Sequence, residues 1–182
     1  EKSSGSITSS SSSTSSTSST DSIKAVDFAS VLKASQALSS EIVLNKLLAS
    51  LLGIVIENAG AEKGWLLREQ AGAWMVEAQG TVDQVQIMPE MQVSLQSLPV
   101  SIFNYVARTQ ETIVLNNATQ DGQFTRDPYI LEKQPRSIMC LPLLNQGKLA
   151  GILYLENNLT TNTFTPARLE ILRFLSAQAA IS

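Results

Sequence analysis

The residue types that most often carry chemistry are scarce in this chain of 182 residues. It contains no histidine and a single cysteine, Cys140, so the commonest general base is missing and neither an internal disulfide nor a cysteine-based zinc cluster can form. The sequence also lacks a Gly-x-Ser-x-Gly nucleophile motif and a phosphate-binding glycine loop. We therefore assign no catalytic or metal-ligating residue and expect a domain that is not itself an enzyme.

Two carboxylates and the cysteine deserve individual interpretation. Asp127 precedes Pro128, which is the pattern of a helix N-cap followed by a proline in the first turn, and we favour this cap over a ligand contact, although both roles can coexist. Glu156 lies in a Leu-Glu-Asn-Asn turn and has an ordinary structural explanation as well. Cys140 lies in an apolar run, which favours a core residue over a redox sensor.

Charge and hydropathy restrict the partners. A net charge of -3 and a pI near 5.0 provide no polycationic surface for nucleic acid. The longest apolar run, residues 42–56, contains Asn45 and Lys46 and is shorter than the roughly 20 residues needed to cross a bilayer. We expect a cytoplasmic domain without nucleic-acid or membrane partners. Because the chain begins with Glu1 and has no secretory pattern, we also expect it to be a segment of a longer polypeptide.

The elements that must position any site begin after a low-complexity stretch. Residues 1–24 are rich in Ser and Thr and are predicted to form a flexible linker, which we favour over a phosphorylation-rich regulatory segment. The domain itself is assigned to residues 25–182. A first helix follows Asp27, and a second, over residues 41–58, is apolar on nearly every side. Such a helix must be enclosed or must face a partner, which suggests a homodimer.

The remaining pattern indicates a sheet flanked by helices. In chain order we predict strands Trp65–Arg68, Ala73–Gln79 and 85–93, a helix from Pro99 to Thr109, a strand 112–115, a short helix Pro128–Lys133, strands Ser137–Leu144 and Lys148–Leu155 joined by an Asn145-Gln146-Gly147 turn, and a last helix after Thr165-Pro166. This order lacks regular βαβ alternation and predicts an α+β domain with a largely antiparallel sheet.

Three segments resemble the GAF family: Phe-Thr-Arg-Asp-Pro-Tyr at 124–129, Ser-Ile-Met-Cys-Leu-Pro-Leu at 137–143 and Gly-Ile-Leu-Tyr-Leu-Glu-Asn at 151–157. The resemblance covers residues 25–182 and is greatest to GAF domains of cyanobacterial multidomain proteins that combine a serine/threonine kinase with a sensor histidine kinase. It implies a central antiparallel sheet of about six strands. It also implies terminal helices on one face and, on the other, a pocket roofed by short helices and loops.

The resemblance implies a sensory domain that binds an unidentified small molecule and relays a signal through its terminal helices. The partners implied are a second copy, through those helices, and the upstream and downstream kinase domains of the same chain. The alternative is a dimerisation and relay module without a ligand. We expect the following residues to line the pocket, although aromatic residues are more often part of a core: Trp65, Phe103, Phe124, Asp127, Tyr129 and Met139.

The better-known ligands of this family do not match the sequence. In Asp121-Gly122-Gln123-Phe124, Gln123 occupies the position where bilin-binding relatives have a cysteine. Asn45-Lys46 lies in an early helix, and the Asp-Glu pair of cyclic-nucleotide-binding relatives is replaced by Asp127-Pro128. Reduction of free methionine sulfoxide needs a resolving thiol that a single cysteine cannot provide. The cofactor is therefore unknown, and an unidentified small ligand is preferred to bilin or cyclic nucleotide.

Overall fold

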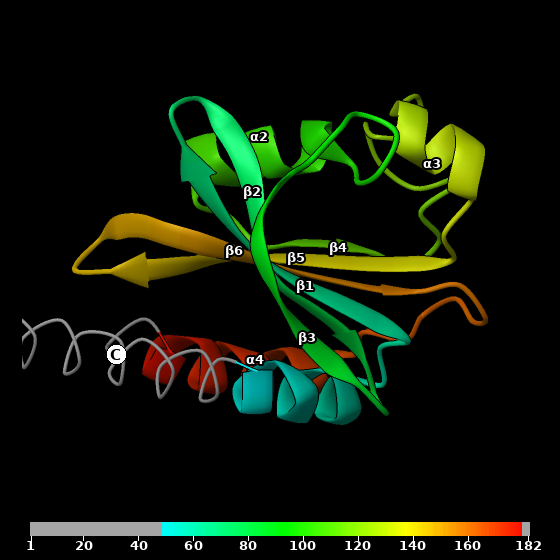
Figure 1. The fold of residues 1–182 in the computed structure, drawn as a ribbon. Helices are drawn as coiled ribbons and strands as arrows, with labels where there is room; N and C mark the ends of the chain where they lie inside the picture. Colours follow the sequence, from blue (N-terminus) through cyan, green and yellow to red (C-terminus); the bar gives the residue numbers. More distant parts are fainter. Residues whose placement is uncertain (1–48, 180–182) are drawn as a thin grey trace, which may run out of the picture. The chain divides into compact units, whose positions relative to one another are not determined.

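A computed structural model of the protein describes residues 49–179, which form a six-stranded antiparallel sheet with helices on both faces (Figure 1). The strand order is β3-β2-β1-β6-β5-β4. In chain order the elements are a helix of residues 49–59, β1 (Lys63–Gln70), β2 (Ala73–Thr81), β3 (Val85–Gln92), α2 (Val100–Thr109), β4 (Ile113–Leu115), α3 (Pro128–Lys133), β5 (Ser137–Asn145), β6 (Lys148–Asn157) and α4 (Pro166–Ala179). The predicted α+β class and central antiparallel sheet are confirmed.

The β5–β6 hairpin forms at the predicted turn. Asn145 pairs with Lys148, and the two residues between them, Gln146 and Gly147, have φ angles of 51° and 75°. Two consecutive left-handed residues in a two-residue turn match the right-handed twist of the flanking strands. The turn sets the pairing at this end of the two strands, and a bulge between Leu143 and Leu144 shifts the register beyond it.

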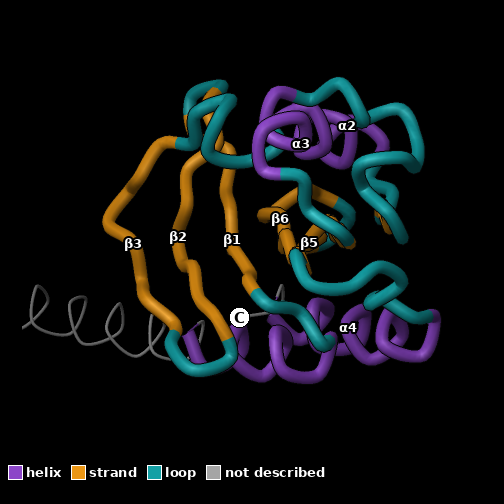
Figure 2. The backbone as a smooth tube through the Cα atoms, turned by 90° about the vertical axis from the view of Figure 1, so that its right-hand side faces the viewer, coloured by secondary structure: helices purple, strands orange, loops and turns teal. Residues whose placement is uncertain are grey.

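One face of the sheet is covered by the terminal helices, as Figures 1 and 2 show from two directions. The helix of residues 49–59 buries Leu52, Val55 and Ile56, and α4 buries Leu172. Gly64 on β1 permits this close packing, because a Cβ there would lie 2.7 Å from Ile56 Cγ1. Of the apolar stripe predicted for the last helix, Leu172 is buried and Leu169 is partly buried against the same core.

The opposite face is covered by α2 and α3. These helices contribute Ile102, Phe103, Val106, Tyr129 and Ile130 to a core that also contains strand residues Leu67, Trp74, Val76, Ile138, Cys140, Ile152 and Tyr154. Cys140 is fully buried, so the prediction of a core cysteine is confirmed. Burial raises the pKa of its thiol well above the ordinary value.

A β-bulge in β2 changes which side chains face α2 and α3. The β1–β2 pairing passes from Leu66 with Ala78 to Leu67 with Val76, which leaves Glu77 as an extra residue on β2. Because strand side chains alternate between faces, an extra residue reverses the alternation beyond it. Ala78 therefore packs on the side of the terminal helices, and Gln79 lies on the side of Trp65.

Several predictions concern residues outside those described. They are the linker 1–24, the helix after Asp27, the Asn45-Lys46 pair and the first part of the helix predicted over 41–58. The helix predicted over residues 41–58 is described from residue 49 and ends at Ala59, and Gly60 follows it with a left-handed φ of 67°. Within residues 49–179 no helix is long and apolar enough to cross a membrane.

Candidate functional site

Five of the six residues predicted to line a pocket lie on the side of the sheet covered by α2 and α3. Trp65 and Tyr129 project from β1 and α3, and Phe103 and Phe124 pack into the same core. Met139 does not join them and belongs to the core beneath the terminal helices. The reason is that Met139 stands between Ile138 and Cys140, which both face α2, and adjacent strand residues point to opposite faces. Its predicted place beside the other five is corrected accordingly.

Aromatic rings fill the centre of this face. The Phe103 ring packs edge-on against Trp74 and Tyr154, with centroids 5.9 and 5.4 Å away. The Trp65 ring is tilted against Tyr154, with centroids 5.4 Å apart. Such offset and edge-on arrangements suit the aromatic quadrupole. The space that could hold a ligand is therefore displaced from the centre toward β1, β2 and β3.

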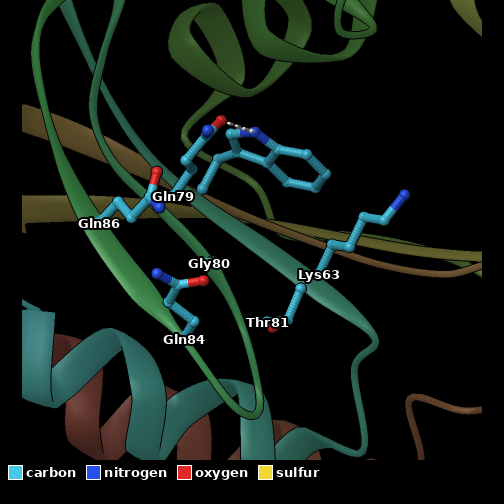
Figure 3. Close-up of a pocket in the computed structure, with 7 residues that line it drawn as sticks. Lys63, Gln79, Gly80, Thr81, Gln84 and Gln86 are labelled. Atoms are coloured by element: carbon cyan, nitrogen blue, oxygen red, sulfur yellow. Dashed lines mark hydrogen bonds between the residues drawn. The ribbon is translucent and has the colours of Figure 1, made fainter.

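A cavity of about 280 Å³ lies beside Trp65, just below the roughly 300–1,000 Å³ typical of ligand pockets. It is lined by Lys63, Trp65, Gln79, Gly80, Thr81, Gln84 and Gln86. Figure 3 shows Gln79, Gln84 and Gln86 on one side of this space, with the Lys63 ammonium pointing away from them. Trp65 Nε1 donates a 3.2 Å hydrogen bond to Gln79 Oε1, which leaves the NH₂ of that amide for another acceptor.

The chemistry of this lining suits binding. Carboxamides donate and accept hydrogen bonds, the indole offers a flat apolar surface, and Lys63 supplies the one formal charge of the lining. Among the described residues no group of three or more His, Cys, Asp or Glu could hold a metal ion. The cavity is therefore equipped to hold a small polar molecule with a flat apolar part.

Trp65 was predicted from the sequence to line a pocket, whereas the glutamines around it were not. A signal existed for Gln84 and Gln86, because they alternate with Val85 and Ile87, whose side chains pack against the opposite core. Gln79 carried no such signal, since the bulge at Glu77 decides which way it faces.

Glu156 on β6 is the more deeply buried of two carboxylates on this side of the sheet, with an exposed fraction of 1% against 6% for Asp127. Its Oε2 accepts hydrogen bonds from the hydroxyls of Tyr129 at 2.7 Å and Tyr154 at 2.9 Å, and Asn158 donates to Oε1 at 3.3 Å. Burial, and then the nearby Glu156 carboxylate, raise the pKa of both tyrosines well above the ordinary value. Both hydroxyls therefore keep their protons and remain donors at neutral pH.

Lys63 lies directly opposite Glu156 in the β1–β6 pairing, yet the two do not form an ion pair. Within the described part of the chain the ion pairs are Arg68–Glu77 and Lys133–Glu132. The tyrosine hydroxyls satisfy the carboxylate, so the Lys63 ammonium is left at the edge of the cavity beside Trp65.

Asp127 joins α3 to the beginning of α2. Its Oδ1 accepts from the backbone N–H of Tyr129 at 2.8 Å, which confirms the predicted N-cap of α3. Its Oδ2 accepts from the backbone N–H of Ser101 at 3.2 Å and from the Ser101 hydroxyl. Pro99, the N-cap residue of α2, makes no side-chain hydrogen bond to the first turn of that helix. Asp127, which lies outside α2, accepts a hydrogen bond from one of the free N–H groups of this turn instead.

The end of β6 connects this face to the terminal helices. Asn157 Nδ2 donates a 3.0 Å hydrogen bond to the carbonyl of Gly60, directly after the helix of residues 49–59. The carbonyl of Glu156 accepts from the backbone N–H of Glu62 at 2.9 Å. The guanidinium of Arg168 on α4 packs on Gly60, since a Cβ there would lie 2.5 Å from Arg168 Nη1. Glu156 and its neighbour therefore contact α3 on one side and, on the other, the segment that follows the helix of residues 49–59.

This arrangement of a sheet between a helical roof and two terminal helices agrees with comparison to known families, in which the GAF domain model matches residues 43–182. The chain belongs to the GAF family. The family fold predicted from residues 124–157 is thereby confirmed.

Curated proteins similar to this GAF domain are histidine kinases. The chain is 48% identical over 83 residues to hybrid signal transduction histidine kinase G of Dictyostelium discoideum, covering 46% of this chain and 2% of that protein. It is 25% identical over 162 residues to the peroxide stress-activated histidine kinase mak3 of Schizosaccharomyces pombe, covering 86% of this chain and 7% of that protein. The chain thus spans a small part of the length of these relatives.

Solved GAF domains share the fold at low sequence identity. The blue-light absorbing form of the Thermosynechococcus elongatus PixJ GAF domain matches with a TM-score of 0.62 and 10% identity, over 79% of this chain and 86% of that one. The GAF domain of an Acinetobacter phosphoenolpyruvate-protein phosphotransferase matches with a TM-score of 0.59 and 19% identity, over 75% and 80%. At this level of sequence identity, the structural similarity establishes the fold only, and function has to be argued from the residues of the site.

Proposed function

We propose that this GAF domain is a sensory and regulatory part of a multidomain histidine kinase and binds a small molecule in the cavity beside Trp65. The observation that carries the proposal is the lining of that cavity, in which three glutamine carboxamides, one of them oriented by the indole N–H, and one ammonium line the space beside Trp65. The similarity to segments of histidine kinases supports the regulatory role. The domain itself is non-catalytic in this proposal, and the kinase activity belongs to other domains of the parent protein.

A ligand in the cavity would act on the terminal helices through a short series of contacts. It would compete for Gln79, which accepts the indole N–H, and so shift Trp65 against Tyr154. The Tyr154 hydroxyl holds Glu156, whose carbonyl accepts from Glu62 just after the first described helix. A change at this end of the sheet would alter the position of the helices that continue into neighbouring domains.

The assembly and setting of the domain are further parts of the proposal. We infer a homodimer through the terminal helices, kinase domains of the same chain as partners, and a cytoplasmic location. The resemblance to GAF domains of cyanobacterial multidomain kinases, which was expected from the sequence, also remains a prediction. In this dimer Ile54, which lies on the exposed side of the helix of residues 49–59, would contact the second copy.

Native mass spectrometry of the 182-residue chain, purified from cells of its own source, tests the ligand. We expect a reproducible non-covalent adduct of low molecular mass and, when that compound is added back, a saturable rise in melting temperature. The Trp65→Phe variant and the Gln84→Ala, Gln86→Ala double variant should each reduce the adduct.

Gln70→Ala is the matched control, because Gln70 is an exposed β1 glutamine that does not line the cavity. Equal adducts in the cavity variants and in this control would rule out the cavity as the site.

The second candidate is a dimerisation and relay module without a ligand. The aromatic packing of Phe103, Trp74 and Tyr154 favours it, because these side chains occupy the centre of the face that α2 and α3 cover. Light scattering coupled to size exclusion would then give a dimer mass that does not change with growth conditions. Adduct-free protein in every condition, together with a stable dimer, would select this candidate over the sensor.

A further inference from the structure

We propose that a groove between α2 and residues 123–128 binds a small phosphate monoester, at a site separate from the cavity beside Trp65. The groove has a volume of about 520 Å³, within the range of ordinary ligand pockets. It is lined by Ser101, Asn104, Tyr105, Arg108, Gln123, Phe124, Arg126, Asp127 and Pro128. This site is independent of the proposed sensory ligand and shares no lining residue with that cavity.

Two guanidinium groups supply the charge of the groove. Arg108 and Arg126 are both exposed, and neither belongs to the ion pairs formed within residues 49–179, which are Arg68–Glu77 and Lys133–Glu132. Arg108 Cζ lies 5.9 Å from the centroid of the Tyr105 ring, which orients the guanidinium without neutralising it. Both groups therefore remain available to an anion from solution.

The strongest acceptors of the groove are already occupied by donors of the protein itself. The Asp127 carboxylate is 6% exposed and accepts three hydrogen bonds, from the backbone N–H groups of Tyr129 and Ser101 and from the Ser101 hydroxyl. Asn104 Oδ1 accepts a 2.9 Å hydrogen bond from Trp74 Nε1, which turns its oxygen inward and leaves its NH₂ as the free group. What the groove offers to a ligand is consequently dominated by N–H donors.

This donor set fits a phosphate group better than a carboxylate. A guanidinium presents a planar fork that matches phosphate oxygens, and two such forks can share a dianion. The lining carries two arginines and one aspartate, a net charge of +1, so a dianion is stabilised more than a monoanion. The edge-to-face pair of Tyr105 and Phe124, with centroids 5.5 Å apart, gives an apolar wall for the organic part of an ester.

Isothermal titration of phenyl phosphate into the 182-residue chain at constant ionic strength tests this site. We expect saturable binding that weakens roughly tenfold in Arg108→Gln and in Arg126→Gln, as loss of a charge-assisted hydrogen bond predicts, and that vanishes in the double variant. Arg136→Gln is the matched control, because Arg136 is exposed and outside the groove. Inorganic phosphate should bind more weakly than the ester, because it lacks the ring.

Each departure from this result has a defined meaning. Benzoate binding as tightly as phenyl phosphate would overturn the preference for phosphate, and equal affinity for inorganic phosphate would overturn the ester. Unchanged binding in the double variant, with a melting temperature like that of the parent chain, would overturn the site itself. The Gln84→Ala, Gln86→Ala variant should bind phenyl phosphate normally, which separates this result from any failure of the sensory cavity.

Discussion

The hydroxyl of Tyr129 lies 2.7 Å from Glu156 Oε2, and this contact joins the short helix α3 to the end of β6. The same tyrosine gives its backbone N–H to Asp127, so its position is fixed at both ends. A buried carboxylate needs such donors, because an unpaired charge in a dry site is costly. This contact therefore adds a polar link between α3 and the sheet to the apolar packing of α2 and α3.

Replacement of Tyr129 by Phe should destabilise the fold by about 1–3 kcal/mol, because it leaves the buried Glu156 carboxylate short of one donor. Urea unfolding followed by tryptophan fluorescence measures the change. Tyr105→Phe is the control, since its hydroxyl makes a 3.3 Å exposed contact with Glu111 and its loss should cost less than about 0.5 kcal/mol. Equal unfolding midpoints for the two variants would show that the buried contact contributes no more to stability than the exposed one.

Stability should fall at alkaline pH because Tyr129 and Tyr154 have raised pKa values in the folded state. Below the ordinary tyrosine pKa of about 10, both hydroxyls are protonated in the folded and in the unfolded chain, so their contribution to the unfolding free energy is fully present. Above it the unfolded state loses protons that the folded state retains, so the unfolding free energy drops by about 1.4 kcal/mol per pH unit for each tyrosine. Cys140 adds a similar loss that begins near its lower ordinary pKa.

Urea unfolding at a series of pH values from 8 to about 11 measures this slope. Tyr154→Phe should remove one tyrosine contribution and flatten the curve above the tyrosine pKa. A parent chain whose stability stays constant across that interval would contradict the assignment of buried, protonated tyrosines.

Local signals in the sequence predicted the elements well. The Asn145-Gln146-Gly147 turn and the Asp127 cap depend on residues adjacent in sequence, and both formed where predicted. The face of Met139 was not predictable, because the run from Ile138 to Leu141 is buried on both sides and shows no alternation. Continuous apolar strands reveal their burial but not their orientation.

The candidate site was predicted less completely, for a nonlocal reason. Gln79 faces the cavity because Glu77 is an extra residue opposite β1, and that register belongs to the pairing of two strands. One partner of Glu156 is similarly distant, since Tyr129 precedes it by 27 residues, whereas Tyr154 and Asn158 are each two residues away. One sequence alone shows which residue types are present, but the strand register and long-range contacts that bring them together become visible only in the structure.

Two glycine-to-alanine changes should have opposite signs. A Cβ at Gly80 would lie 2.6 Å from the carbonyl oxygen of Gln84 and 2.7 Å from Val85 Cγ2, so Gly80→Ala should cost about 1–3 kcal/mol by overpacking the β2–β3 turn. Gly53 lies in a helix, where a Cβ would make an ordinary 3.5 Å contact with Val85 Cγ2. Gly53→Ala should therefore stabilise by about 0.5–1 kcal/mol. Thermal and urea unfolding of both variants measure the signs, and a stabilising change at Gly80 would mean that this turn relaxes freely.

Cys140 should react with a thiol reagent only when the chain unfolds. Its side chain is fully buried in β5, and burial raises its pKa, so the native state offers neither access nor thiolate. Labelling with a chromogenic disulfide at pH 8 should be at least about a thousandfold slower in native protein than in urea, because only the rare unfolded molecules react. The urea-unfolded chain is the control for intrinsic reactivity. Native labelling at a rate close to that of the unfolded chain would mean that β5 opens locally, and would return Cys140 to consideration as a redox sensor.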